Sequence, residues 1–219
     1  MMRCVLVTAA MLTFAGSSLL AQDLEAVCNE FRQLVVGQWA EYEIVLDHGK
    51  ARSRFAVVGT EEASGKEHYW YETRMASPMG DMIMQLLIPS FSYEQSDIKK
   101  AVVKMGDQPA VIVSDEMLAM MPGRGAENPA LDAASACEKA ELVDQENVTV
   151  PAGTFDVMHL RVGADEEKAD IWVSSEVPFG MVKLQGEGAE LVLLRHGKGA
   201  KSSITEKPQR MPGIPPDEM

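Results

Sequence analysis

Four histidines are the first residues at which this chain could perform acid–base or metal chemistry. They are His48, His68, His159 and His196. None belongs to an H-x-x-x-H or H-E-x-x-H pattern and none stands beside a cysteine, so a zinc site is not indicated. We expect His48 in a turn and the other three on strands, as structural or surface histidines.

Nucleophilic and carboxylate chemistry are also not indicated. The chain has no G-x-S-x-G elbow, and neither Cys28 nor Cys137 stands in a context typical of a catalytic Cys–His pair. Acidic residues gather at 61–62 and 165–167, both in predicted turns and without the D-x-D-x-D-G pattern of a calcium loop. The G-x-G at 186–188 lacks a following helix and fits a hairpin turn. We therefore predict a non-enzymatic protein with no catalytic residue, no metal site and no cofactor.

Methionine supplies the strongest indication of a function. Ten of the fifteen methionines lie between Met75 and Met181, and methionine is common on adaptable apolar binding surfaces. These residues predict a lining or lid of an apolar cavity, with ordinary core packing and a thioether copper(I) site as the alternatives. The predicted ligand-binding residues are Tyr69, Tyr71, Met82, Met84, Leu86, Met117, Met120 and Met121.

Residues 1–21 have the pattern of a secretory signal peptide. Arg3 supplies the positive charge, an apolar and small-residue run follows it, and Ala21 suits the last position before cleavage. A retained membrane anchor is the alternative, which the short and interrupted apolar run disfavours. No later stretch is long and apolar enough to span a bilayer. We expect a periplasmic or secreted protein with no stable membrane span after cleavage.

Cleavage after Ala21 would leave Cys28 and Cys137 as the cysteines of the exported chain. In an oxidising compartment they are most simply one disulfide, although two buried thiols are an alternative. Such a bridge would close a loop of about half the chain and contribute roughly 4–5 kcal/mol in the chain-entropy model.

The overall charge excludes some partners. Asp and Glu number 33 against 20 Lys and Arg, which gives a formal net charge of −13. That balance disfavours nucleic acid and anionic membrane surfaces, because both attract basic patches. The 219 residues, 46% of them hydrophobic, suffice for one domain with a substantial core.

The elements that would carry these residues are mostly strands. At 148–162, V-T-V-P-A-G-T-F-D-V-M-H-L-R-V alternates on both sides of Pro151-Ala152-Gly153, which predicts a hairpin with a three-residue turn. The apolar segment 79–89 fits a strand, a helix or a lid. Alternation predicts strands at 38–46, 53–59, 67–75, 96–105, 141–150, 154–162, 168–173, 180–185 and 190–196.

Helices are few. Apolar residues recur at helical spacing from Asp23 to Val36, which predicts an amphipathic helix that Gly37 ends. Short helices are expected at 115–121 and after residue 128. We thus predict a signal peptide (1–21), one mainly β half-barrel or open-barrel domain built on a curved antiparallel sheet (22–200), and a disordered proline-rich tail (201–219).

Three motifs together resemble a known family. They are V-T-V-P-A-G-T-F at 148–155, I-W-V-S at 171–174 and V-P-F-G-M-V-K at 177–183. The chain from about 38 to 196 is similar to the periplasmic lipoprotein-carrier (LolA-like) half-barrel superfamily. The resemblance implies a curved sheet around a helix-plugged apolar cavity that shelters acyl chains. We therefore predict an exported binding protein for a lipid-like or other hydrophobic ligand. The alternative is a solid-cored structural or interaction protein of the cell envelope with a protein partner.

Overall fold

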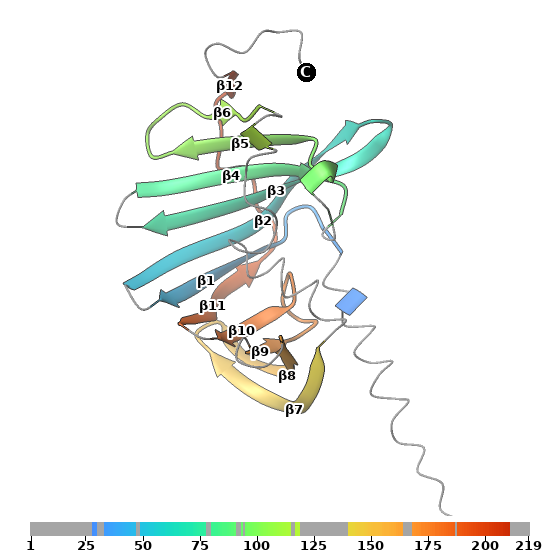
Figure 1. Cartoon of the computed structure of the whole chain (residues 1–219), viewed down its shortest axis with the longest axis vertical. Coiled ribbons are helices and arrows are strands. Elements are labelled where there is room, and N and C mark those ends of the chain that lie inside the picture. Colours follow the sequence, from blue (N-terminus) through green and yellow to red (C-terminus); the bar gives the residue numbers. More distant parts are fainter. Residues whose placement is uncertain are drawn as a thin grey trace, which may run out of the picture.

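The computed structural model describes residues 28–29, 33–46, 49–77, 80–90, 93, 95–114, 117–118, 140–163, 168–186 and 188–210. Within them, strands dominate and join in one open sheet (Figure 1). The strands are β1 (Trp39–Leu46), β2 (Gly49–Ala63), β3 (Lys66–Ser77), β4 (Gly80–Ile88), β5 (Lys100–Met105), β6 (Val111–Ile112), β7 (Glu141–Val150), β8 (Gly153–Val162), β9 (Ala169–Val173), β10 (Met181–Gly186), β11 (Ala189–Gly197) and β12 (Gln209–Arg210), with a 3-10 helix η1 (Gln95–Asp97) before β5.

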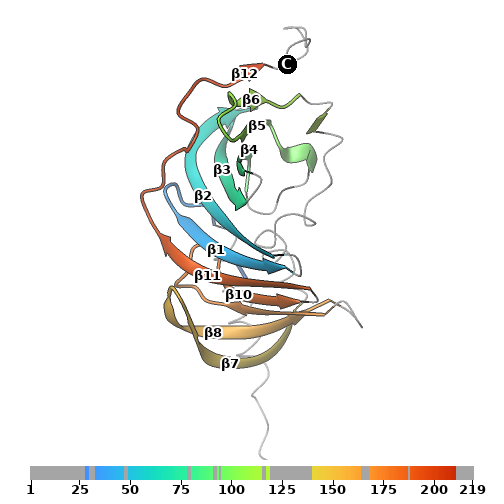
Figure 2. The same ribbon diagram turned by 90° about the vertical axis from the view of Figure 1, so that its left-hand side faces the viewer.

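The sheet consists of two antiparallel meanders that meet at β1 and β11. Its order is β12-β6-β5-β4-β3-β2-β1-β11-β10-β9-β8-β7, and only β12 and β6 pair in parallel. Figure 2 shows that the sheet curves strongly along this order. The predicted mainly β, curved antiparallel sheet is therefore confirmed.

Most predicted strands are present, and several are longer than predicted. Residues 80–88 of the undecided segment 79–89 form β4, so this part is a strand and not a helix or a lid. Glu61 and Glu62, predicted in a turn, belong to β2, which ends at a turn through Ser64 and Gly65. The two-residue strands β6 and β12 were not predicted, because so short a pairing leaves no periodicity in the sequence.

The hairpin at 148–162 is confirmed with a shorter turn than predicted. Val150 pairs directly with Gly153, so the loop contains only Pro151 and Ala152. Gly153 begins β8 with φ +142°, a backbone conformation that residues with a Cβ rarely adopt. The predicted three-residue loop was wrong because Gly153 takes part in the ladder.

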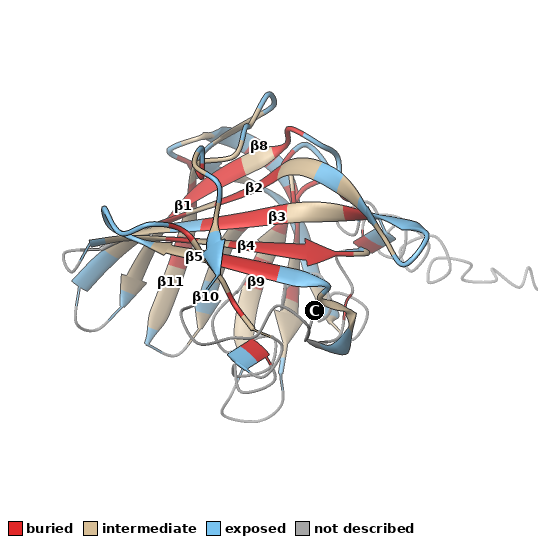
Figure 3. Ribbon diagram, turned by 90° about the horizontal axis from the view of Figure 1, so that it is seen from above, coloured by how far each residue is buried: buried red, intermediate tan, exposed pale blue. Residues whose placement is uncertain are grey.

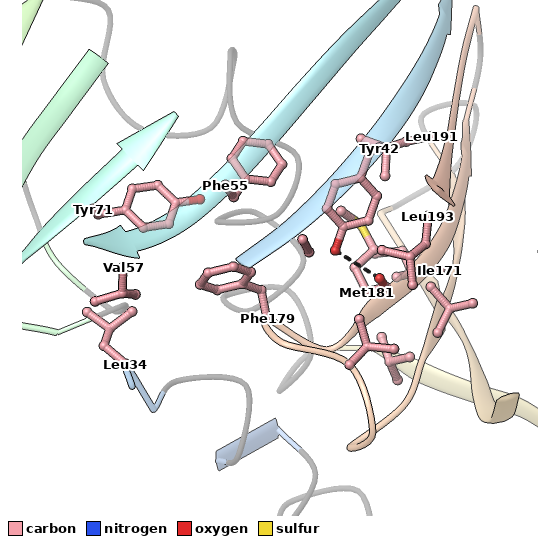
Figure 4. Packing of buried hydrophobic residues seen from close by; sticks show 14 of the residues in the cluster. Leu34, Tyr42, Phe55, Val57, Tyr71, Ile171, Phe179, Met181, Leu191 and Leu193 are labelled. Carbon is pink, nitrogen blue, oxygen red and sulfur yellow. Dashed lines mark hydrogen bonds between the residues drawn. The ribbon is translucent and has the colours of Figure 1, made fainter. Parts of the chain in front are cut away.

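The concave inner face of the sheet carries the main hydrophobic core. Tyr42, Phe55 and Tyr71 come from β1, β2 and β3 and are each at most 1% exposed. Their rings follow one another at centroid distances of 5.6 and 6.2 Å (Figure 4). The Tyr42 hydroxyl donates a hydrogen bond of 3.0 Å to the carbonyl of Met181, which joins the two meanders across the core. Figure 3 shows buried positions concentrated along the middle of the strands.

The N-terminal segment differs from the predicted helix. Residues 28 and 29 are helical, but 33–35 have no regular structure and 36–37 form a turn, so no helix reaches Val36. Val35 and Val36 are 54% and 52% exposed. The Gly37 N–H donates instead to the Val57 carbonyl at 2.7 Å, and the Val57 N–H donates to the Gln38 carbonyl at 3.0 Å. Pairing with β2 thus replaces the last helical turn. The remaining residues of the predicted helix lie outside the described ones.

The chain after β11 forms an ordered strap over the convex outer face. We call residues 198–210 the C-terminal strap; it crosses the sheet from β11 to β6, where β12 pairs (Figure 2). Ile204 is buried there in a small cluster with Ile83, Val102 and Ala110. Residues 201–210 therefore do not form the predicted disordered tail, because they find apolar and hydrogen-bonding partners on the sheet. Residues 211–219 lie outside the described part.

Glu72 anchors the strap. This β3 carboxylate is fully buried on the outer face. The Ser203 N–H and hydroxyl donate to its two oxygens at 2.9 and 2.7 Å, and the Gln85 amide donates at 2.7 Å. Because the strap supplies uncharged hydrogen-bond donors at this point, the carboxylate is buried with its hydrogen bonds satisfied.

Candidate binding site

A pocket of about 490 Å³ opens where three segments distant in the sequence meet, beside the start of β1, the start of β10 and the end of β11. We call it the rim pocket. Its volume lies in the range of small-molecule sites, about 300–1,000 Å³. The lining residues are Gln33, Val35, Gln38, Ser175, Glu176, Val177, Pro178, Phe179, His196, Gly197 and Lys198.

The loop between β9 and β10 forms one wall. The Ser174 N–H donates to the Gly180 carbonyl at 2.8 Å and closes the loop at its base. Phe179 has φ +65°, which is unusual for a residue with a Cβ and marks local backbone strain. This conformation turns the Phe179 side chain into the inner core, where it meets Tyr71 edge to face at 5.8 Å (Figure 4). The pocket wall is therefore continuous with the core.

The other walls come from the N-terminal segment and the end of β11. The Gln38 side chain is 8% exposed, and its amide donates to the Gln33 carbonyl at 3.3 Å. His196, the last residue but one of β11, lies beside Phe155 at a ring distance of 5.7 Å. The Ala200 N–H donates to the Gly37 carbonyl at 2.8 Å, which holds these two walls together.

The lining is amphipathic. Val35, Val177, Pro178 and Phe179 form an apolar side, while Gln38 and His196 offer hydrogen-bonding groups. Glu176 and Lys198 contribute one charge of each sign. Such a pocket suits a ligand with an apolar part and a polar end.

The predicted ligand-binding residues lie elsewhere on the inner face. Tyr69 and Tyr71 on β3 and Met84 and Leu86 on β4 share one face, and all four belong to the core cluster or pack against it. Met82 lies on the same face near the start of β4 and is half-buried. None of these five residues lines the rim pocket; Phe179 links the two regions.

Of the remaining predicted site residues, the structure describes Met117 and Cys28. Met117 is helical and 38% exposed, and its N–H donates to the Ser114 hydroxyl at 3.2 Å. Met120 and Met121 lie outside the described residues, as do the predicted helix after residue 128 and the acidic group at 165–167. Cys28 is buried in the inner core, but Cys137 is outside the described residues, so the disulfide stays a prediction.

His68, His159 and His196 lie on strands, as predicted, and His48 is outside the described residues. His68 is buried, with Nδ1 at 3.0 Å from the Lys66 carbonyl. In the part of the chain that the structure describes, no three His, Cys, Asp or Glu side chains converge as a metal site.

His159 belongs to an outer-face cluster that sequence reasoning missed. It stacks on Trp172 at 4.5 Å, and its Nε2 donates to Asp170 at 2.9 Å. Arg161 also donates to Asp170, while Lys183 lies 5.0 Å from the centre of the Trp172 ring. The residues alternate along β8, β9 and β10, but only the register brings them side by side. Because both His159 and Lys183 contact the Trp172 ring, the cluster is a cross-strand ladder that supports the sheet.

This ladder predicts that the folded state loses stability in acid. Partial burial raises the pKa of Asp170, but the hydrogen bonds from His159 and Arg161 and the Arg161 charge outweigh it, so the pKa lies below that of a free aspartate. A carboxylate whose pKa is lower in the folded state than in the unfolded state stabilises the fold at pH values above its unfolded-state pKa. This contribution is lost as the pH falls through the folded-state pKa. We expect this part of the stability to be intact at neutral pH and lost below about pH 4. Urea unfolding across this range should show a shallower acid decline for Asp170→Asn; an unchanged decline would contradict the assignment.

Comparison with known proteins gives structural likenesses only. No family model and no curated protein matches the sequence. A candidate lipoprotein from Parabacteroides distasonis has 11% identity and a TM-score of 0.36, covering 76% of this chain and 98% of the other. A candidate exported protein of YmcC-like fold from Bacteroides fragilis has 13% identity and a TM-score of 0.35, covering 75% and 97%.

A further likeness is to a larger protein. MucB in the MucA/MucB complex of Pseudomonas aeruginosa has 13% identity and a TM-score of 0.39, covering 84% of this chain and 58% of the MucB chain. All these TM-scores are below 0.5, so a function for this chain has to be argued from its own residues. Among the described residues no helix is long and apolar enough to cross a membrane.

Proposed function

We propose that this protein is an exported, non-enzymatic binding protein of the cell envelope that holds a lipid-like or other amphiphilic small molecule at the rim pocket. The observation that carries the proposal is the pocket itself, whose apolar wall continues into the inner core through Phe179. Export is supported by the signal-peptide pattern of residues 1–21.

The pocket divides a ligand between two environments. An apolar chain would lie along Val35, Val177 and Phe179, where burial contributes roughly 25 cal/mol per Å². A polar end group would face Gln38 and His196, which offer hydrogen-bonding groups beside it. This chemistry would shelter a ligand without a covalent step.

Two neighbouring valines provide the test. Val35 and Val36 are 54% and 52% exposed, but only Val35 lines the rim pocket. Val35→Asp would place a carboxylate against the apolar wall, so we expect it to weaken binding of a dansyl-labelled fatty acid by about tenfold, or 1.4 kcal/mol. The same change at Val36 should leave the affinity within about twofold. Fluorescence titration of the exported chain, with folding followed by circular dichroism, measures both.

Two outcomes would contradict this assignment. Equal effects of Val35→Asp and Val36→Asp would show that the rim pocket is not the site. No bound amphiphile in native mass spectrometry, together with no displacement by fatty acids or lysophospholipids, would remove the carrier function.

A structural or interaction protein is the second candidate, and the packing of the inner face favours it. Phe55, Tyr71 and Phe179 are each at most 4% exposed, so protein side chains fill the middle of the concave face. If native mass spectrometry finds no amphiphile, this candidate becomes the better one. Crosslinking in envelope extracts should then recover a protein partner, and Val35→Asp should leave its capture unchanged.

A further inference from the structure

Three methionines form a cross-strand row on the inner face, away from the rim pocket. Met75 of β3 pairs directly with Met82 of β4, and Met82 pairs directly with Met105 of β5. Their positions in the sequence show no period, so the register of three strands is what aligns them. All three share the face that carries Tyr71 and Leu86.

The row is accessible. Met105 is 57% exposed, and Met75 and Met82 are half-buried. The row lies where β3 and β5 end and β4 begins, beyond the buried middle of the sheet. An ion could therefore reach the three thioethers without opening the core.

The spacing allows three sulfurs to share one ion. Residues directly opposite on antiparallel strands have Cβ atoms about 4.5–5.5 Å apart, so Met75 and Met105 flank Met82 at about that distance on each side. Methionine has three rotatable bonds, which lets the outer thioethers lean toward the central one. One ion placed near the Met82 sulfur is then within reach of all three thioethers.

The surroundings select the kind of ion. On β2, the residue that pairs with Met75 is Ser53. The next row toward the middle of the sheet consists of Phe55, Thr73, Met84 and Val103. Neither of these two rows brings a charged side chain to this face. Thioethers are soft, neutral ligands that favour copper(I), whereas hard cations need carboxylate or carbonyl oxygens. We propose that Met75, Met82 and Met105 form a binding site for a soft monovalent cation, copper(I) or silver(I).

Met82 and Met84 provide a matched pair for the test. Both lie on β4 and on the same face, but Met84 opposes Thr73 and Val103 and stands outside the row. We expect Met82→Leu to lower the affinity for silver(I), a redox-inert probe, by at least about tenfold, since it removes the central ligand. Met84→Leu should leave the affinity within about twofold. Leucine conserves volume, and circular dichroism checks the fold of each variant.

Titration calorimetry of the exported chain in chloride-free buffer gives the silver(I) affinity, and competition with bicinchoninate under reducing conditions gives that of copper(I). The methyl resonances of Met75, Met82 and Met105 should shift on binding. A variant with all three methionines changed to Leu retains the cysteines, so its remaining affinity measures how much the cysteines contribute to metal binding. The site would be refuted by equal affinity of that variant and the original chain, by equal losses for Met82→Leu and Met84→Leu, or by unshifted row methyls.

Discussion

Phe179→Ala is expected to lower the free energy of unfolding by about 3–5 kcal/mol, the range for truncating a buried phenylalanine. The Phe179 ring is 4% exposed and packs edge to face on Tyr71 at 5.8 Å (Figure 4). Alanine would leave a cavity between the two meanders and keep the strained positive φ of this position. Urea denaturation followed by fluorescence and circular dichroism measures the change.

Phe179→Leu is the control for this prediction. It retains part of the buried volume, so the loss should be clearly smaller than that of the alanine variant. A loss below about 1 kcal/mol for Phe179→Ala would show that the loop between β9 and β10 does not anchor the core. In that case the rim pocket would also lack a fixed apolar wall.

Glu72→Ala is expected to cost about 2–4 kcal/mol and to loosen the C-terminal strap. The change removes the acceptor for the Ser203 N–H, the Ser203 hydroxyl and the Gln85 amide. Hydrogen bonds to a charged group contribute about 1.5–3 kcal/mol each, and donors left buried without a partner add to the loss. Since Lys201 lies just before this contact and is exposed, trypsin should cut the strap after Lys201 faster in the variant.

Glu67→Ala provides the matched control, because Glu67 lies on the same strand with an exposed side chain. Its effect should stay within about 0.5 kcal/mol, as is usual for surface substitutions. Ser203→Ala, which removes one donor, should fall between the two variants. Equal stability and equal trypsin cleavage of Glu72→Ala and Glu67→Ala would show that the strap is held by Ile204 and β12 alone.

The positions of most strands along the sequence were predictable because strand formation leaves local signals. Tyr69, Tyr71 and Met75 alternate with polar residues, and β3 forms there. The segment 79–89 could not be decided because its apolar residues are nearly continuous, and a period is visible only where polar residues interrupt it. Its partners β3 and β5 make it a strand.

The C-terminal end of the helix before Gly37 and residues 201–210 of the tail were misjudged for a related reason. Leu34 and Val35 have helical spacing to Phe31, but β2 offers the backbone of this segment a pairing that local spacing does not reveal. The strap has proline and charge, which suggest disorder. Its order depends on Glu72 and Ile83, more than a hundred residues earlier in the chain.

The sequence by itself determined where strands and tight turns occur, because alternation and the Pro151–Gly153 turn act over a few residues. Only the tertiary structure decided which strands are neighbours and in which register. That register forms the Met75–Met82–Met105 row. Contacts between segments far apart in the sequence bring 33–38, 175–179 and 196–198 together as the walls of the rim pocket. Both sites depend on contacts between distant segments, and such contacts leave no period in the sequence.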